Sequence, residues 1–155
     1  MLKMLASGMA AAVLMTGVAN ANGPLSSTLE AYIVGTDDDG TETLTSTDEI
    51  TPGETIEYVL VYENTGDTAL SGLVVSAPIP ASTTFIMGSD TQQTAAVFEV
   101  SADDGATWGE PPLMRVSEDG EEEILVSEYD MVRWVPTDAI DAGKTWQFKY
   151  RTSVE

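Results

Sequence analysis

The sequence predicts an all-β fold, an immunoglobulin-like β-sandwich of seven to nine strands. Apolar and polar residues alternate in short runs, and a period of two is the side-chain period of a strand. Clusters of Asp, Asn, Gly and Pro recur at intervals of about eight to twelve residues, as in sandwiches and barrels. No window repeats apolar residues at the helical spacing of three and four. Because the chain has no cysteine, it is not an antibody-type domain with a disulfide between its sheets.

The first predicted strand spans residues 28–34, and a turn of three aspartates and a glycine follows it. Asp favours turns because it hydrogen-bonds nearby backbone groups, and Gly because it tolerates positive φ. A threonine-rich stretch at 41–50 is able to form a second strand. We expect the first strand to bury three side chains, Leu29, Tyr32 and Val34.

Residues 52–80, PGETIEYVLVYENTGDTALSGLVVSAPIP, show the strongest strand pattern. In residues 56–63 one face carries isoleucine, tyrosine and leucine, and the other carries glutamate and valine. An Asn-Thr-Gly-Asp turn leads to a second strand at 69–77. Because proline cannot donate to a β-ladder, Pro78 and Pro80 indicate an edge strand or a crossover between sheets.

The C-terminal half predicts shorter strands and one long aromatic strand. In the strand at 95–101 we expect Val97 to face inward, together with Phe98 or Val100. The acidic stretch 118–123 is expected to form a turn between two strands. In the last strand aromatic residues alternate with Gln147, Lys149 and Arg151, so that one face is aromatic and the other polar. The strands of this half are expected at 83–87, 95–101, 114–116, 124–126, 129–135 and 144–154.

Residues 1–21 have the features of a bacterial secretory signal peptide. Lys3 precedes an apolar run from Met9 to Val18, which ends at an Ala-Asn-Ala cleavage signal. This run is about half of the roughly 20 residues that a transmembrane helix needs. We therefore expect a secreted protein that is extracellular or on the cell surface, with the periplasm as the alternative. A single domain is expected at residues 22–155, without a membrane span.

The composition excludes several kinds of chemistry. The chain has no cysteine and no histidine, so it has neither disulfides nor a Ser-His-Asp triad nor a histidine-bound zinc. Its formal net charge of −20 repels nucleic acids and anionic lipids and attracts divalent cations and basic surfaces. A hydrophobic content of 43% argues against disorder.

Acidic loops are the only clusters whose residue types indicate ligand chemistry. Calcium takes six to eight oxygen ligands and is commonly bound in such loops, although the spacing here does not match an EF-hand. The alternative is that these residues form ordinary solvated turns, with no cofactor. The candidate calcium ligands are Asp37, Asp38, Asp39, Asp103 and Asp104.

Two further kinds of chemistry are disfavoured by the pattern. Pairs of carboxylates can form a glycosidase site, but the aromatic residues occupy core positions and leave no aromatic groove, so we expect no enzymatic activity. An isopeptide crosslink requires a lysine next to an Asn or Asp and a buried acid. Lys149 alternates with the aromatic residues, and we expect it to lie on the surface instead.

The segment ITPGETIEYVLVYENTGDTALSGLVVSAPIPASTTFI, together with residues 100–112 and 132–154, resembles domain of unknown function 11. This family is an immunoglobulin-like module of bacterial and archaeal surface proteins, and the resemblance covers about residues 50–155. It rests on the Pro-Gly turn, the central Tyr58, the Asn-Thr-Gly turn and Pro80; Ala77 stands where many members have Asp. The resemblance implies structural or adhesive work without catalysis, with Tyr58 and Trp134 in the core.

These observations predict an exported structural subunit that assembles with copies of itself, or with other surface proteins, into a filament, pilus-like fibre or matrix. No anchor is expected after the last strand, and open sheet edges are a common route of assembly. The alternative is a soluble module that binds a carbohydrate, a protein or calcium. Neither a nucleic acid nor a membrane is an expected partner.

Overall fold

The backbone of residues 23–46 and 48–155, which the computed structural model describes, consists of strands, turns and one short 3₁₀ helix, η1 (Val126–Glu128). The predicted all-β fold is therefore confirmed, while the predicted signal peptide at residues 1–21 lies outside the described residues. No helix in the described part is long and apolar enough to span a bilayer.

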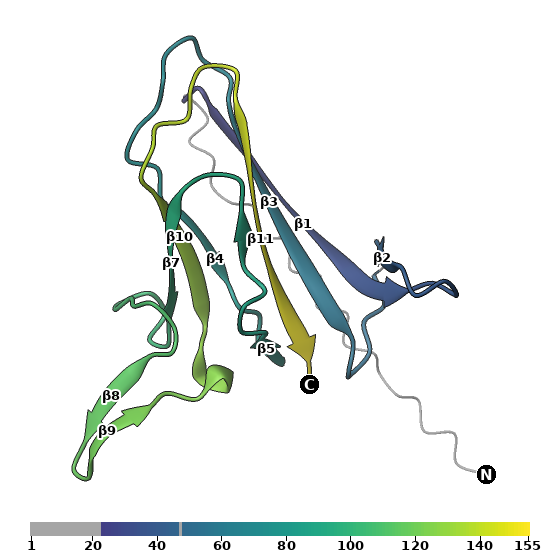
Figure 1. Cartoon of the computed structure of the whole chain (residues 1–155), viewed down its shortest axis with the longest axis vertical. Coiled ribbons are helices and arrows are strands. Elements are labelled where there is room, and N and C mark those ends of the chain that lie inside the picture. The colour runs from purple at the N-terminus through teal and green to yellow at the C-terminus, as the bar shows by residue number, and fades with distance from the viewer. Residues whose placement is uncertain (1–22, 47) are drawn as a thin grey trace.

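The larger sheet contains three long antiparallel strands, β1 (Leu25–Thr36), β3 (Thr55–Asn64) and β11 (Thr145–Val154). The short strand β2 (Glu42–Thr45) pairs with the end of β1, and β5 (Thr83–Phe85) and β6 (Thr91–Gln92) pair with β11. The order across the sheet is β2-β1-β3-β11-β5. Figure 1 shows β1 and β2 at the right, beyond the area that the smaller sheet covers.

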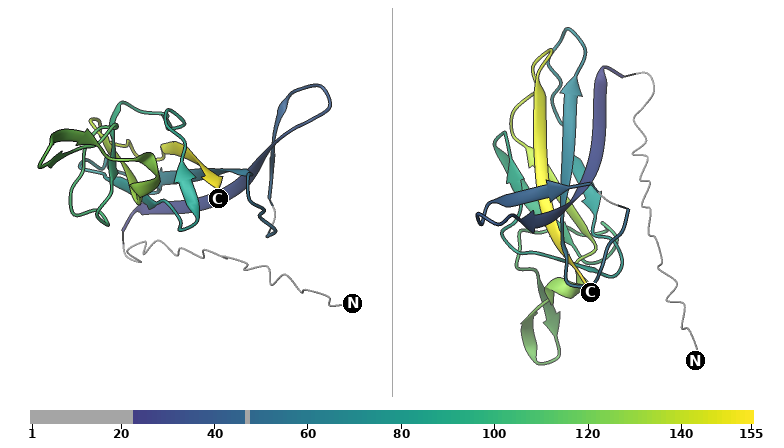
Figure 2. Two further views of the ribbon diagram at one scale, coloured as in Figure 1. Left: turned by 90° about the horizontal axis from the view of Figure 1, so that it is seen from below. Right: turned by 90° about the vertical axis from the view of Figure 1, so that its right-hand side faces the viewer.

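The smaller sheet has the order β4-β10-β7, with β4 (Val75–Pro78), β10 (Met131–Pro136) and β7 (Ala96–Ser101). It packs against β3 and β11, and the right-hand view of Figure 2 shows the long narrow shape of the sandwich. A hairpin of β8 (Met114–Ser117) and β9 (Gly120–Glu123) projects from its lower end. The predicted crossover at Pro78 and Pro80 is confirmed, because β4 is an edge strand and β5 belongs to the other sheet.

The connectivity differs from that of an immunoglobulin constant domain in one respect. There the last strand lies in the same sheet as the strand before it. Here β10 lies in the smaller sheet, whereas β11 crosses to the larger sheet and lies between β3 and β5. β10 lies between β4 and β7 in the smaller sheet, and the last strand, β11, is an inner strand of the larger sheet.

The core lies between the inner faces of β3 and β11 and the smaller sheet. Residues directly opposite each other in an antiparallel ladder share a face, and Tyr58 opposes Tyr150 while Leu60 opposes Phe148. The two tyrosine rings stack with centroids 4.8 Å apart. The alternation read from the sequence therefore places its aromatic residues in the core, and Tyr58 is buried as expected.

Trp134 on β10 joins the two sheets. Its side chain is fully buried, and its ring lies 5.3 Å from that of Phe98, 5.4 Å from Phe148 and 6.1 Å from Tyr150, measured between centroids. Tilted contacts of this kind stabilise a core beyond the area that they bury. The prediction that Trp134 fills the core is confirmed.

A buried asparagine holds the turn after β3. Asn64 donates from its amide nitrogen to the carbonyl oxygens of Thr68 (2.7 Å) and Ile140 (2.9 Å), and it accepts a hydrogen bond from the N–H of Gly66 (3.0 Å). Gly66 is required here by close approach, because a Cβ at this position would lie 2.6 Å from the side chain of Pro24. In the Asn-Thr-Gly turn, the buried polar side chain of Asn64 therefore has hydrogen-bond partners for both its donor and its acceptor.

Several details of the predicted strands are wrong. Leu29 lies on the inner face of β1, opposite Leu60, but Tyr32 and Val34 lie on the outer face. In β7 the inward side chains are those of Phe98 and Val100, whereas Val97 is exposed. These errors arise because a half-buried strand with apolar residues on both faces does not show which face meets the core.

The acidic stretch and two strand boundaries also differ from the prediction. Residues 120–123 form strand β9 rather than a turn, because each of its glutamates faces solvent on a projecting hairpin and none has to be buried. The strand expected at 41–50 is limited to β2, and the strand expected at 69–77 to β4. Residue 70 makes only an isolated bridge with residue 140.

Two valine-to-alanine substitutions test the assignment of the core. Val132 is fully buried in β10, and Val132→Ala should lower the free energy of unfolding by about 2 kcal/mol, because buried methyl groups are lost and a cavity remains. The same substitution at Val116, which is 83% exposed on the hairpin, should have little effect. Urea unfolding followed by tryptophan fluorescence measures both, and equal losses would contradict this core.

Candidate functional site

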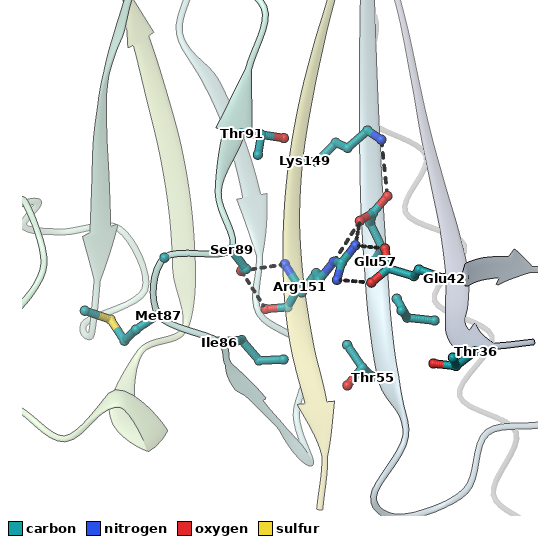
Figure 3. Close-up of a pocket in the computed structure, with 12 residues that line it drawn as sticks. Thr36, Glu42, Thr55, Glu57, Ile86, Met87, Ser89, Thr91, Lys149 and Arg151 are labelled. Carbon is teal, nitrogen blue, oxygen red and sulfur yellow. Dashed lines mark hydrogen bonds and ion pairs between the residues drawn. The ribbon is translucent and has the colours of Figure 1, made fainter. Parts of the chain in front are cut away.

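The outer face of the larger sheet carries an open groove of about 700 Å³. The β1–β2 hairpin borders it on one side and residues 86–91, between β5 and β6, border it on the other. Its floor is formed by side chains of β3 and β11 that point away from the core (Figure 3). The groove is lined by Val34, Thr36, Glu42, Thr55, Glu57, Ile86, Met87, Gly88, Ser89, Thr91, Lys149 and Arg151.

Arg151 is the central polar group of this groove. Its Nε donates to Glu57 on β3 at 2.8 Å, and its two terminal nitrogens contact both carboxylate oxygens of Glu42 on β2. A bidentate arginine–carboxylate pair fixes orientation as well as distance. Arg151 therefore ties the β2 hairpin to the centre of the sheet, three strands away in the sheet order.

Glu57 is an acid that the sheet buries. It is 5% exposed, and its carboxylate meets the Nζ of Lys149 at 3.3 Å and a terminal nitrogen of Arg151 at 2.7 Å. A buried charge is tolerated only when it is paired and hydrogen-bonded. The outward orientation predicted for Lys149 is confirmed, and its partner is this carboxylate.

The ion pairs shift the pKa values of Glu42 and Arg151. The hydrogen bonds from Arg151 lower the pKa of the Glu42 carboxyl below its ordinary value. The hydrogen bond to Glu42 is also the largest cause that raises the pKa of Arg151, and Glu57 adds to it. Both groups therefore stay charged at neutral pH.

The hydroxyl group of Ser89 bonds to the backbone of β11. The Oγ of Ser89 accepts a hydrogen bond from the N–H of Arg151 at 2.9 Å and donates to the carbonyl oxygen of the same residue at 3.4 Å (Figure 3). In this arrangement Ser89 completes the β11 edge where residues 86–91 pass it. The groove is thus a self-paired structural centre, in which two cations meet two acids.

The first calcium candidate is the turn between β1 and β2, which the side chain of Asp37 caps. One carboxylate oxygen of Asp37 accepts from the N–H groups of Asp39 (3.0 Å) and Thr41 (2.9 Å). Asp38 and Asp39 are exposed beside it. The carboxylate of Asp37 is used to close the turn, as aspartate commonly does.

The second candidate, in the loop after β7, is held in the same way. Asp103 accepts from the hydroxyl (2.6 Å) and N–H (2.8 Å) of Thr107 and from the hydroxyl of Ser101 (2.8 Å). The hydroxyl of Thr107 is the largest cause that lowers the pKa of Asp103. The N–H of Asp104 donates to Asp130 at 2.7 Å.

Within residues 23–46 and 48–155, no three acidic side chains converge where a metal ion could be held. The structure brings Asp37, Asp38 and Asp39 together in one turn and Asp103 and Asp104 in another, and it does not join the two turns into one site. Calcium binding at either turn stays a prediction.

Sequence reasoning missed the Arg151 groove. The alternation of Lys149 and Arg151 with aromatic residues indicated that both cations share the outer face. Nothing in the pattern indicated that Glu57 opposes Arg151 in the ladder, or that Glu42 folds back across β1 to reach it. The signal available was one glutamate, Glu57, in an otherwise apolar strand core.

The second feature of the larger sheet is the free edge of β1. On one side β1 pairs with β3 along residues 25–34, but on the other side β2 covers only residues 33–36. Among the described residues no strand pairs with this side of residues 25–32. The edge is therefore open over eight consecutive positions, from Leu25 to Tyr32.

The direction of the free backbone groups follows from the ladder. The N–H and C=O of Asn64 bond to Lys144 and Gly143, on the β11 side. The backbone N–H and C=O groups of successive residues point alternately to the two sides of a strand. Those of Glu63 and Val61 therefore point to β1, where they bond to their ladder partners Ser26 and Thr28. The intervening residues must then point outward. The free N–H and C=O groups are those of Leu25, Ser27, Leu29 and Ala31.

Comparison of the chain with protein-family models, with curated proteins and with solved structures finds no match. The resemblance to domain of unknown function 11 stays a prediction. The fold and the two features of the larger sheet, its self-paired groove and its open edge, are the observations from which a function can be argued.

Removal of the central arginine should destabilise the fold. In Arg151→Gln, Glu57 keeps only Lys149 as its partner, and an undercompensated buried charge should cost about 2 kcal/mol of the free energy of unfolding. Glu42→Gln removes an exposed partner of the same arginine and should cost much less. Urea denaturation measures both. A larger loss in Glu42→Gln than in Arg151→Gln would show that Glu57 does not depend on Arg151.

Asp103 should give the fold a pH dependence in the acid range. Because its pKa is lower in the folded state, its contribution is complete above the ordinary aspartate value of 3.8 and is lost as the pH falls through the folded value. Asp103→Asn should therefore be less stable than the wild type at neutral pH, and the difference should shrink below that value. Urea midpoints measured across the acid range test this, with Asp38→Asn as the exposed control. A difference that does not change with pH would contradict the assignment.

Proposed function

We propose that the protein is an exported, non-catalytic structural subunit, which assembles at a cell surface by adding a strand of a neighbouring subunit to the free edge of β1. The observation that carries this proposal is the eight-residue edge at residues 25–32, whose outward N–H and C=O groups have no strand partner among the described residues. Strand addition at such an edge supplies main-chain hydrogen bonds, and side-chain contacts add specificity.

The edge lacks the features that keep sheets apart. Natural proteins protect edges with lysine, proline, bulges or very short strands. Residues 25–32 contain neither lysine nor proline, and their one charged residue, Glu30, accepts a hydrogen bond from the hydroxyl of Tyr32 at 2.6 Å. The opposite edge of the same sheet is formed by the short strands β5 and β6. Among these edges, β1 is the one suited to pairing.

An added strand would also cover apolar surface. The inner face of β1 carries Leu25, Leu29, Ala31 and Ile33, and β1 lies beyond the smaller sheet in Figure 1. Ala31 is exposed although it lies on this inner face, and Leu29 is only half-buried. A strand paired with β1 would extend the larger sheet and place its own side chains beside these residues.

The charge of the chain sets the condition for assembly. Subunits with a formal net charge of −20 repel one another, and salt weakens the repulsion because the Debye length falls from about 30 Å at 0.01 M to about 3 Å at 1 M. Since the edge itself carries little charge, contact there adds little local repulsion. We therefore expect assembly that increases with ionic strength.

Substitutions at Ala31 test this proposal. Ala31→Pro removes one outward N–H group, and Ala31→Lys places a protecting charge on the edge, whereas both leave the hydrogen bonds to β3 in place. Sedimentation and negative-stain microscopy in high salt should show assemblies of the wild type and loss of assembly in both variants.

Ala106→Lys makes the same charge change at an exposed loop position and should assemble like the wild type. Circular dichroism verifies that all variants are folded. The proposal is wrong if the wild type stays monomeric at every salt concentration, or if both Ala31 variants assemble normally.

A further inference from the structure

A second groove of about 700 Å³ lies at the upper end of the sandwich in Figure 1, where the loop after β10 meets the loop between β6 and β7. It differs from the Arg151 groove in composition, because it combines an indole ring with acids, a lysine, an amide and hydroxyl groups. The side chains that matter here are those of Gln93, Thr94, Asp138, Asp141, Lys144 and Trp146.

The walls of this groove are held in place by backbone hydrogen bonds. The N–H of Thr137 donates to the carbonyl oxygen of Ala95 at 3.0 Å, so the two loops are joined. Gln93 bonds to Gln147 on β11 twice, through its own N–H (3.1 Å) and through its side-chain oxygen (3.0 Å). The indole of Trp146 packs against the edge of the core. A site formed before its ligand arrives loses little entropy on binding.

Four side chains of this groove carry polar groups that have no partner in the part of the chain that the structure describes. No hydrogen bond or ion pair to another described residue is recorded for the carboxylates of Asp138 and Asp141, the ammonium of Lys144 or the indole N–H of Trp146. In the Arg151 groove, by contrast, the charged groups satisfy one another. Unpaired donors and acceptors that line a groove beside an aromatic ring are typical of a ligand site.

We infer that this groove binds a neutral saccharide. Sugar hydroxyls both donate and accept hydrogen bonds, so they can donate to Asp138 and Asp141 and accept from Lys144 and from the indole N–H. The apolar C–H face of a sugar ring can cover the half-buried indole of Trp146. An anionic ligand would meet two carboxylates, and a cationic ligand would meet Lys144.

This binding site does not depend on the proposed assembly. Trp146 lies on β11, which β3 separates from the free edge of β1. Variants at Ala31 therefore leave the saccharide site intact, and variants of the groove leave the edge intact. The proposed assembly and the proposed saccharide binding can therefore be disproved independently of each other.

Nuclear magnetic resonance of the indole N–H groups tests the inference. The chain has three tryptophans, and Trp146→Phe assigns the signal of Trp146. Maltohexaose, cellohexaose and hexa-N-acetylchitohexaose are titrated separately to about 10 mM, which detects millimolar dissociation constants. At least one of them should shift the signal of Trp146 and leave those of Trp108 and Trp134 in place.

Substitution of the exposed acids provides the matched comparison. Asp138→Ala and Asp141→Ala should each weaken binding about tenfold, because each removes a charged hydrogen-bond acceptor, whereas Asp119→Ala on the β8–β9 turn should leave it unchanged. Both acids are exposed, so the variants should fold normally.

Three results would overturn the inference. The first is the absence of any shift of the Trp146 signal with all three saccharides. The second is undiminished binding in both acid variants. The third is a shift with hexalysine but with none of the saccharides, which would make the groove a site for basic peptides.

Discussion

The sandwich depends on the contact of one indole with the opposite sheet. Trp134 on the smaller sheet packs against Phe148 and Tyr150 on β11, and both of these rings are fully buried. A cysteine-free chain has no disulfide between its layers, so packing of this kind has to contribute most to holding them together. The Arg151 groove and the free edge of β1 therefore depend on the aromatic core for a stable sheet.

The net charge of the chain does not show how its arginines are paired with glutamates. Each arginine of the described chain meets at least one glutamate: Arg115 contacts Glu122 and Glu128, Arg133 contacts Glu99, and Arg151 contacts Glu42 and Glu57. The three arginines are thus placed where strands or hairpins are joined, and acidic residues dominate the remaining surface of the described chain. This division keeps the β1 edge and the saccharide groove free of internal ion pairs.

The sequence predicted the fold class and the main strands because strand periodicity is local information. The alternation in residues 56–63 and 144–154 was sufficient to place the aromatic residues of β3 and β11 on one face, whereas the core position of Trp134 was expected from the family resemblance. The alternation was not sufficient for the groove, because Arg151 and Glu42 are 109 positions apart and meet only through the register of β2, β1, β3 and β11. A free edge at the first strand was expected as a route of assembly, but its extent could not be predicted, since it results from β2 ending after four residues.

The inner position of β11 has a consequence for how the chain folds. The ladder between β3 and β11 joins residue 56 to residue 152, so a chain that has emerged only as far as residue 143 lacks an inner strand of its larger sheet. Contacts between segments so distant in sequence form slowly. Until its last strand arrives, the polypeptide should stay unfolded, which is the form that a narrow export channel would admit.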